Sequence, residues 1–189
     1  MNLSTRSGGS DTLYARMPSE RVGVLIGHDG GTKKRLEEAT GTHIAVDSDT
    51  GEVTIDEKGM ADPVLALKAR EVVRAVAAGF SEERAFRLLD EDAYLEVLDV
   101  KDFAHSRNRV SQIKARLIGS RGKTRRLIEE LTGVDVSVGG HTVALIGESF
   151  EMAIAREAVI MLLRGSEHAT VYRFLERKRA DIRAWQMGF

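Results

Sequence analysis

The sequence predicts an α+β fold made of two copies of one β-α-α-β-β-α unit, followed by a C-terminal helix. Two observations support this prediction. A segment of seventeen residues occurs twice, 92 positions apart, and each copy is followed by two short alternating strands and a long helix. A period of about 90 residues indicates two small domains rather than a stack of short repeats.

The repeated segment is residues 25–41 and again 117–133, with identical residues at nine of the seventeen ungapped positions. Each copy contains two glycines three apart, and these are Gly27, Gly30, Gly119 and Gly122. Glycine allows positive φ and a close approach of the backbone, and the free N–H groups of a new helix begin beside this turn. Each glycine turn is therefore a candidate phosphate-binding loop.

The first unit is expected over residues 12–80, after a Ser/Gly-rich flexible tail at 1–11. Its strands are predicted at 12–17, 43–46 and 52–55, and its helices at 19–26, 30–41 and 63–78. Ser19 is a possible N-cap, and Pro63 suits the first helical turn. A connecting helix capped by Ser81 is expected within 81–92.

The second unit is expected over residues 93–165, with 101–107 as an insertion that the first unit lacks. Its strands are predicted at 94–100, 134–138 and 142–146, and its helices at 109–118, 123–132 and 149–163. A further helix at 170–184, within the extension 166–189, has no predicted counterpart in the first unit. Its basic side consists of Arg173, Arg177, Lys178, Arg179 and Arg183. We expect a packed extension with a solvated basic face, or alternatively a second phosphate- or protein-contacting face.

Charge is distributed unevenly along the chain. The net charge is −1, but residues 1–92 carry −5 and residues 93–189 carry +4. Eight basic residues and no acidic one lie between Phe103 and Ile128. Such a run is usually a solvated face, but here it surrounds a glycine turn, where phosphate contacts need cations beside backbone donors.

Composition excludes several classes of site. The absence of cysteine rules out disulfides, thiolate metal sites and cysteine nucleophiles. No apolar run reaches the length of a membrane span and the start lacks a signal core, so the cytoplasm is the expected location. Aromatic residues make up 5%, so an aliphatic groove is a better candidate for base contacts than an aromatic stacking platform.

Three sharper interpretations are not favoured. Gly122-Lys123-Thr124 resembles the end of a nucleotide-triphosphatase loop, but Leu117 stands where that loop needs glycine and a helix precedes it. The five histidines show no metal-ligand spacing. The repeated pairs Glu37-Glu38 and Glu129-Glu130 are expected at exposed helix positions, because adjacent helical residues do not face each other.

Ile-Gly-x-x-Gly between two helices, followed by a strand, resembles the type I KH domain, whose GxxG loop clamps single-stranded nucleic acid. Residues 122–133 and 170–179 are similar to archaeal members of the Pno/Dim family, two-KH proteins of small ribosomal subunit assembly. The resemblance covers about residues 12–183. It implies that each unit is a three-stranded antiparallel sheet with helices on one face.

We therefore expect a non-enzymatic protein that binds single-stranded RNA across the second GxxG loop, without metal or cofactor. The candidate RNA-binding residues are Lys114, Arg116, Ile118, Gly119, Ser120, Arg121, Gly122, Lys123, Arg125, Arg126 and Val136. The first loop is expected to be weaker or altered, because Asp29 would repel a phosphodiester. Its residues are Gly27, His28, Asp29, Gly30, Lys33 and Lys34.

The family resemblance also implies partners. These are the 3′ end of small-subunit ribosomal RNA, an rRNA-processing endonuclease and the alpha subunit of an initiation factor. Two alternatives remain open from the residues alone. One is a protein-interaction scaffold whose first unit binds a partner, and the other is a general KH-type binder of RNA or single-stranded DNA without a ribosomal role.

Overall fold

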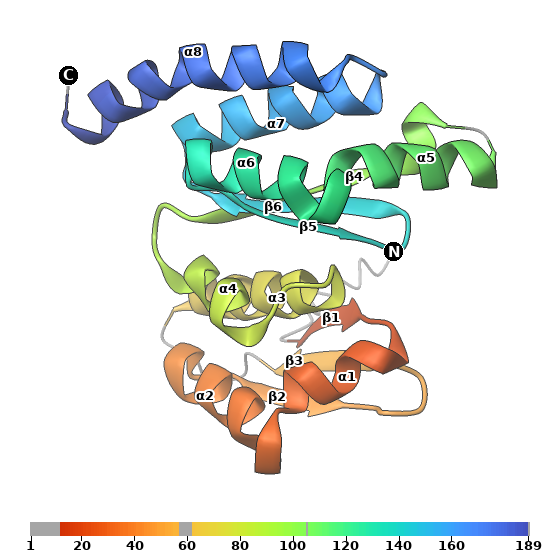
Figure 1. Ribbon diagram of the computed structural model, residues 1–189. Coiled ribbons are helices and arrows are strands. Elements are labelled where there is room, and N and C mark those ends of the chain that lie inside the picture. Colours follow the sequence, from red (N-terminus) through yellow and green to blue (C-terminus); the bar gives the residue numbers. More distant parts are fainter. Residues whose placement is uncertain (1–11, 57–61, 105, 189) are drawn as a thin grey trace, which may run out of the picture.

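The computed structural model describes residues 12–56, 62–104 and 106–188, so the predicted tail at 1–11 lies outside the described residues. The chain forms two three-stranded antiparallel sheets, each with its own helices, and one long helix at the C-terminal end (Figure 1). This confirms the predicted α+β class and the two KH domains. Among the described helices, none combines the length and apolar character that a membrane crossing requires.

The first KH domain follows the predicted order of elements. These are β1 (Thr12–Arg16), α1 (Ser19–Ile26), a 3₁₀ turn (His28–Gly30), α2 (Gly31–Thr40), β2 (His43–Val46), β3 (Glu52–Asp56) and α3 (Pro63–Ala77). The strand order is β1-β3-β2, and Ile55 of β3 lies opposite both Leu13 and Ile44. Alternate residues of β3, Val53 and Ile55, are fully buried beneath the helices.

The second KH domain repeats this order after a short connection, α4 (Glu82–Phe86) and a 3₁₀ turn (Arg87–Leu89). Its elements are β4 (Tyr94–Asp99), a 3₁₀ turn (Val100–Phe103), α5 (Arg107–Ile118), a 3₁₀ turn (Ser120–Gly122), α6 (Lys123–Thr132), β5 (Asp135–Gly139), β6 (Thr142–Gly147) and α7 (Ser149–Leu163). The strand order β4-β6-β5 leaves β5 at the sheet edge.

The two domains are stacked, because the central strand of the second sheet, β6, is buried on both faces. Val143 and Leu145 of β6 enter the core beneath α5, α6 and α7, whereas Ala144 and Ile146 enter the core that contains α3. Figure 1 shows α3 and α4 lying between the two sheets. The first domain's helices thus cover the sheet face that the second domain's own helices leave open.

Helix α8 (His168–Gln186) belongs to the second domain's hydrophobic core, to which it contributes Val171, Leu175 and Ile182. Its start has a counterpart in the first copy, contrary to the sequence prediction. Helices α3 and α7 are both followed by a glycine at φ near +100°, Gly79 at +107° and Gly165 at +100°, and then by another helix. The correspondence between α4 and α8 is not visible in the sequence, because α4 ends after five residues whereas α8 continues for nineteen.

Of the two predicted N-caps, Ser81 occupies the N-cap position of α4, whereas Pro18 takes the place predicted for Ser19. Two capping side chains that were not predicted are also present, and one of them moves a helix boundary. Neither Ser19 nor Ser81 makes a side-chain capping bond. Asp62 caps α3 by accepting from the Val64 N–H at 2.9 Å. Ser106 caps α5 by accepting from the Arg109 N–H at 3.3 Å, so α5 starts at Arg107 and takes up the end of the expected insertion.

Candidate nucleic-acid interface

The two glycines of the second loop have different structural tasks. Gly119 has φ +72°, and a Cβ built on it would lie 2.2 Å from Thr124 Oγ1, so this glycine is packed against the first turn of α6. Gly122 has φ +77°, but a Cβ there would meet nothing within 4 Å. The first glycine therefore closes the turn, and the second leaves the backbone open to solvent.

The first loop has the same backbone and a different tip. Asp29 and Arg121 are the only described residues other than glycine with positive φ, at +51° and +52°. Asp29 binds His28 through an Oδ2–Nδ1 contact of 3.0 Å, and both side chains are almost fully exposed. At the equivalent tip, Ser120 and Arg121 are exposed and carry no negative charge. The two loops thus present opposite charges on one scaffold.

The predicted phosphate-binding cations divide into two groups. Lys114, Arg121, Lys123 and Arg126 have no carboxylate within 4 Å among the residues that the structure describes. Arg116 instead donates to the carbonyl oxygens of Gly165 and Ser166, which ties α5 to the turn before α8. Arg125 lies 3.8 Å from Glu129 and is partly buried. Four of the six predicted cations are therefore available to a ligand.

The aliphatic part of the prediction needs correction. The side chains of Leu117 and Val136 are both only 2% exposed and belong to the second domain's core. Val136 therefore cannot line an open groove with its side chain. Ile118, which is 37% exposed, is the aliphatic residue beside the loop with accessible surface.

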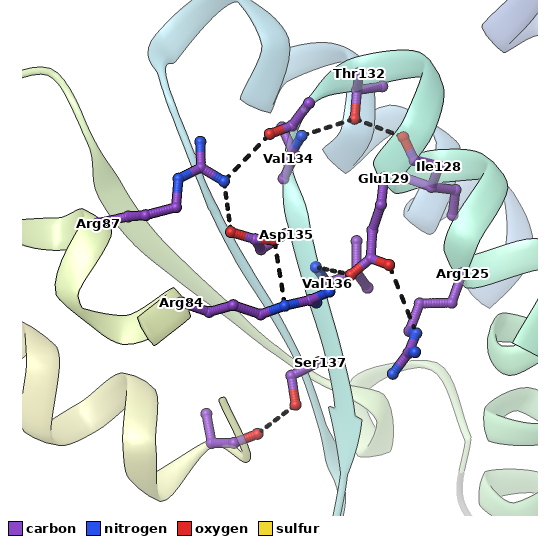
Figure 2. A network of polar contacts seen from close by, with 12 residues as sticks. Arg84, Arg87, Arg125, Ile128, Glu129, Thr132, Val134, Asp135, Val136 and Ser137 are labelled. Atoms are coloured by element: carbon purple, nitrogen blue, oxygen red, sulfur yellow. Dashed lines mark hydrogen bonds and ion pairs between the residues drawn. The ribbon is translucent and has the colours of Figure 1, made fainter. Parts of the chain in front are cut away.

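In each copy of the repeat, one glutamate joins the GxxG helix to the edge strand. Glu129 Oε1 accepts from the Val136 N–H at 3.0 Å, and Glu37 Oε1 accepts from the Ile44 N–H at 2.7 Å (Figure 2 shows Glu129). The expectation of exposed positions is wrong for these two and holds for Glu38 and Glu130. Sequence spacing alone could not reveal a bond to a strand seven residues away.

The environment of Glu37 favours its charged form. Partial burial alone would raise the pKa of Glu37, but the hydrogen bond from Ile44 and the neighbouring Lys33 and His43 hold that pKa below its usual value. Lys33 binds Glu37 at 3.1 Å, and Lys34 lies 3.8 Å from Glu38. Both lysines of the first loop therefore already have a carboxylate partner, unlike Lys123 and Arg126.

The connection between the domains docks on the edge of the second sheet (Figure 2). Arg84 Nη1 donates to Glu129 Oε1 at 2.6 Å and lies 3.6 Å from Asp135 through Nε. Arg87 binds the other oxygen of Asp135, and Ser137 donates to the Ala78 carbonyl oxygen at 2.9 Å. Burial opposes the charged form of Arg84, but Glu129 and Asp135 raise the pKa of Arg84 above its usual value.

Helices α4 and α8 dock at equivalent places on the two GxxG helices. Thr32 at the start of α2 donates to Glu82 of α4 at 2.7 Å. Thr124 at the start of α6 shares a hydrogen bond of 2.8 Å with Tyr172 Oη of α8. The Gly-Lys-Thr sequence is therefore preceded by helix α5, and its threonine hydroxyl contacts α8, an arrangement unlike the strand–loop–helix of a nucleotide-triphosphatase loop.

Replacing Glu129 by alanine is expected to lower the free energy of unfolding by about 1.5–3 kcal/mol, because Val136 N–H and Arg84 both lose a charged partner. At about 2–4 °C per kcal/mol, the melting temperature should fall by roughly 3–12 °C. Glu130→Ala is the matched control, since Glu130 is exposed and its loss should stay within about 0.5 kcal/mol. Equal melting temperatures for the two variants would contradict the role of Glu129.

Comparisons with known proteins agree with the geometry. A family model described as the eukaryotic type KH domain (KH domain type I) matches residues 94–180, and a KH domain model matches residues 12–69. The KH domain-containing protein MJ0443 of Methanocaldococcus jannaschii is 48% identical over 169 residues, which cover 89% of this chain and 74% of that protein.

Solved structures show the same arrangement. The crystal structure of Dim2p from Pyrococcus horikoshii OT3 matches with a TM-score of 0.82 and 47% identity, covering 88% of this chain and 98% of that chain. A chain in the crystal structure of the a/eIF2alpha–aDim2p–rRNA complex from the same organism matches with a TM-score of 0.84 and 46% identity, covering 90% of this chain and 94% of that chain.

Proposed function

Because the chain belongs to the archaeal Pno/Dim family of tandem KH-domain proteins, we propose that it binds single-stranded RNA at the second GxxG loop during small ribosomal subunit assembly. The observation that carries this proposal is the exposed tip of that loop. Arg121, Lys123 and Arg126 surround the open Gly122 without carboxylate partners among the described residues. Cations beside free backbone donors are what a phosphodiester requires.

The family relatives suggest the identity of the RNA and the partners. A similar chain is seen together with rRNA and a/eIF2alpha. This supports rRNA as the ligand and the alpha subunit of an initiation factor as one partner. From the family resemblance alone, we further propose the 3′ end of small-subunit rRNA as the target and an rRNA-processing endonuclease as another partner. The protein itself performs no catalytic step in this role, and its place of action is the cytoplasm.

The salt dependence of RNA binding tests the phosphate clamp. A clamp on about four nucleotides should give a slope of log K against log salt near −2 to −3, at roughly −0.7 per neutralised phosphate. Lys123→Ala should flatten that slope by about 0.7 and should lower the affinity for all RNA sequences by a similar factor. Ile118→Ala should leave the slope unchanged and reduce the preference among bases. Fluorescence anisotropy of a labelled oligonucleotide at several salt concentrations measures both, and an affinity independent of salt would contradict the clamp.

The first domain supports a second candidate function, that of a protein-contact module. Its loop carries Asp29 at the tip, and its lysines already bind Glu37 and Glu38. Substitutions at His28 and Asp29 should therefore weaken the binding of a partner protein, such as the initiation factor subunit, and leave the RNA affinity unchanged. Pull-down of the subunit by variants of the first loop and by variants of the second loop separates the two functions. Only the first-loop variants should lose the subunit, and only the second-loop variants should lose RNA.

A further inference from the structure

The second GxxG loop lies between two helix ends, and the start of α8 binds both of them. His168 and Tyr172 are four residues apart and so share one face of α8, with their ring centroids 5.9 Å apart. His168 Nε2 donates to the carbonyl oxygen of Arg116 at 2.9 Å. Tyr172 Oη shares a hydrogen bond of 2.8 Å with Thr124 Oγ1. One ring thus binds the last turn of α5 and the other binds the first turn of α6, on the two sides of the loop.

The contact with α5 uses a group that the helix itself leaves free. The last four carbonyl groups of a helix have no partner within it, and the Arg116 carbonyl is one of them because α5 ends at Ile118. His168 supplies the missing donor. The Arg116 side chain in turn donates to the carbonyl oxygens of Gly165 and Ser166, which lie just before α8. The end of α5 and the start of α8 therefore hold each other through two sets of hydrogen bonds.

The contact with α6 supports the first glycine of the loop. Thr124 is 1% exposed, and its Oγ1 lies 2.2 Å from the position of a Cβ on Gly119. The hydroxyl that Tyr172 binds is therefore the group against which Gly119 packs. Because a buried hydroxyl without a hydrogen bond is costly, loss of the Tyr172 hydroxyl would force Thr124 to rearrange and would loosen the packing of Gly119.

The first domain lacks this pair of rings. Counted from the glycine that follows α3 or α7, Glu82 stands at the position of His168. Phe86 stands at the position of Tyr172 and has no hydroxyl. Thr32, at the start of α2, donates instead to Glu82 Oε2 at 2.7 Å. The helix after the first loop is thus bound to a carboxylate, which disfavours a nearby phosphate, whereas the helix after the second loop is bound to a neutral phenol.

We propose that His168 and Tyr172 are positioning residues for RNA binding, which hold the second GxxG loop in its binding-competent form without touching the RNA. If only a fraction of the molecules has an ordered loop, the apparent affinity falls by that fraction. A loop already held by α8 loses less conformational freedom when the RNA binds. This inference rests on the proposed RNA-binding function and gives the start of α8 a role that the basic face of that helix does not share.

The test uses Tyr172→Phe, which removes one hydroxyl and introduces the residue of the first domain. The affinity of the full chain for a single-stranded RNA tetranucleotide should fall about fivefold, which corresponds to about 1 kcal/mol, the net contribution of one hydrogen bond. The slope of log K against log salt should stay unchanged, because no phosphate contact is lost. Tyr94→Phe, which removes the hydroxyl of an exposed tyrosine in β4, is the matched control and should change neither quantity.

Hydrogen exchange and a rescue variant separate positioning from a general loss of stability. In the RNA-free protein, Tyr172→Phe should speed exchange at the amides of Gly122 and Lys123, which bond to the loop's own carbonyl oxygens. His168→Ala should also lower the RNA affinity at an unchanged slope. His168→Gln should restore most of that affinity, since its amide can donate to the Arg116 carbonyl. Thermal unfolding confirms that every variant is folded at the temperature of measurement.

Thr124→Val removes the other side of the Tyr172 hydrogen bond and completes a double-mutant cycle. Each single variant and the double variant Thr124→Val/Tyr172→Phe should lose RNA affinity by a similar factor. Additive losses, or an unchanged affinity of Tyr172→Phe, would overturn the positioning role. A slope flattened by about 0.7 in Tyr172→Phe would overturn it too, since it would show a lost phosphate contact. An unmodified chain that does not bind the tetranucleotide would contradict the RNA-binding function itself, and the positioning role with it.

Discussion

The double substitution Ser120→Asp/Arg121→Asp is expected to reduce the affinity for a short single-stranded RNA at least a hundredfold. It removes a charge-assisted contact worth about 1.5–3 kcal/mol and adds two carboxylates facing the phosphates. The fold should survive, because both side chains are exposed. Aspartate also tolerates the backbone of position 121, since Asp29 adopts the same positive φ in the first loop. Equilibrium binding at one fixed salt concentration gives the affinity, and thermal unfolding checks the fold.

The matched change in the first loop is His28→Asp, which creates the same Asp-Asp tip. It should alter RNA affinity less than threefold, because Asp29 already makes that tip unfavourable to a phosphodiester. Equal losses from the two loops would mean that both domains bind RNA through their glycine turns. A loss of RNA affinity only from the first-loop variant would mean that the first domain, not the second, binds the RNA.

Gly119→Ala is expected to destabilise the fold by more than about 3 kcal/mol. With φ +72° and ψ 175°, the backbone of Gly119 lies in a region that essentially only glycine adopts. The Cβ of an alanine would also lie 2.2 Å from Thr124 Oγ1 and 2.8 Å from the Thr124 backbone nitrogen. Relieving that overlap moves Thr124 away from Tyr172, its partner at 2.8 Å. At about 2–4 °C per kcal/mol, the melting temperature should fall by more than about 6 °C.

Gly122→Ala is the control for the second glycine. Its φ of +77° and ψ of 13° lie in the left-handed region, which costs an alanine about 1–2 kcal/mol, and its Cβ meets no atom within 4 Å. It should therefore unfold at a higher temperature than Gly119→Ala while losing RNA affinity, because the added methyl group lies where the ligand approaches. Equal melting temperatures for the two variants would contradict the packing of Gly119 against Thr124 as a source of stability.

Much of the fold could be predicted because glycines mark its boundaries. Gly41 and Gly133 end the GxxG helices in the left-handed conformation, as their positions after the last helical residues indicated. The internal repeat then gave the order of elements in both domains. The stacking of the domains was not predicted. The continuous apolar run in β6, Val143 to Ile146, is typical of a strand buried on both faces and was the signal for it.

The candidate site was predictable at the level of the loop and less so at the level of single side chains. Alternation could not tell that Val136 faces the core, because an edge strand beside a groove shows the same pattern. A basic residue in a basic run does not reveal its partner, so Arg116 was assigned to phosphate although it binds two backbone carbonyls. Arg84, which comes from the connection between the domains, was missed because its partners are 45 and 51 residues away.

Amide chemical shifts during titration with a single-stranded RNA tetranucleotide test the central claim most directly, since they locate the bound strand on the chain. The account predicts that the largest shift changes occur at the backbone N–H groups of Gly119 to Lys123 and along the exposed face of α5. The amides from Gly27 to Gly31 should change little. Changes confined to the first loop, or spread over α8 with the second loop unaffected, would contradict it.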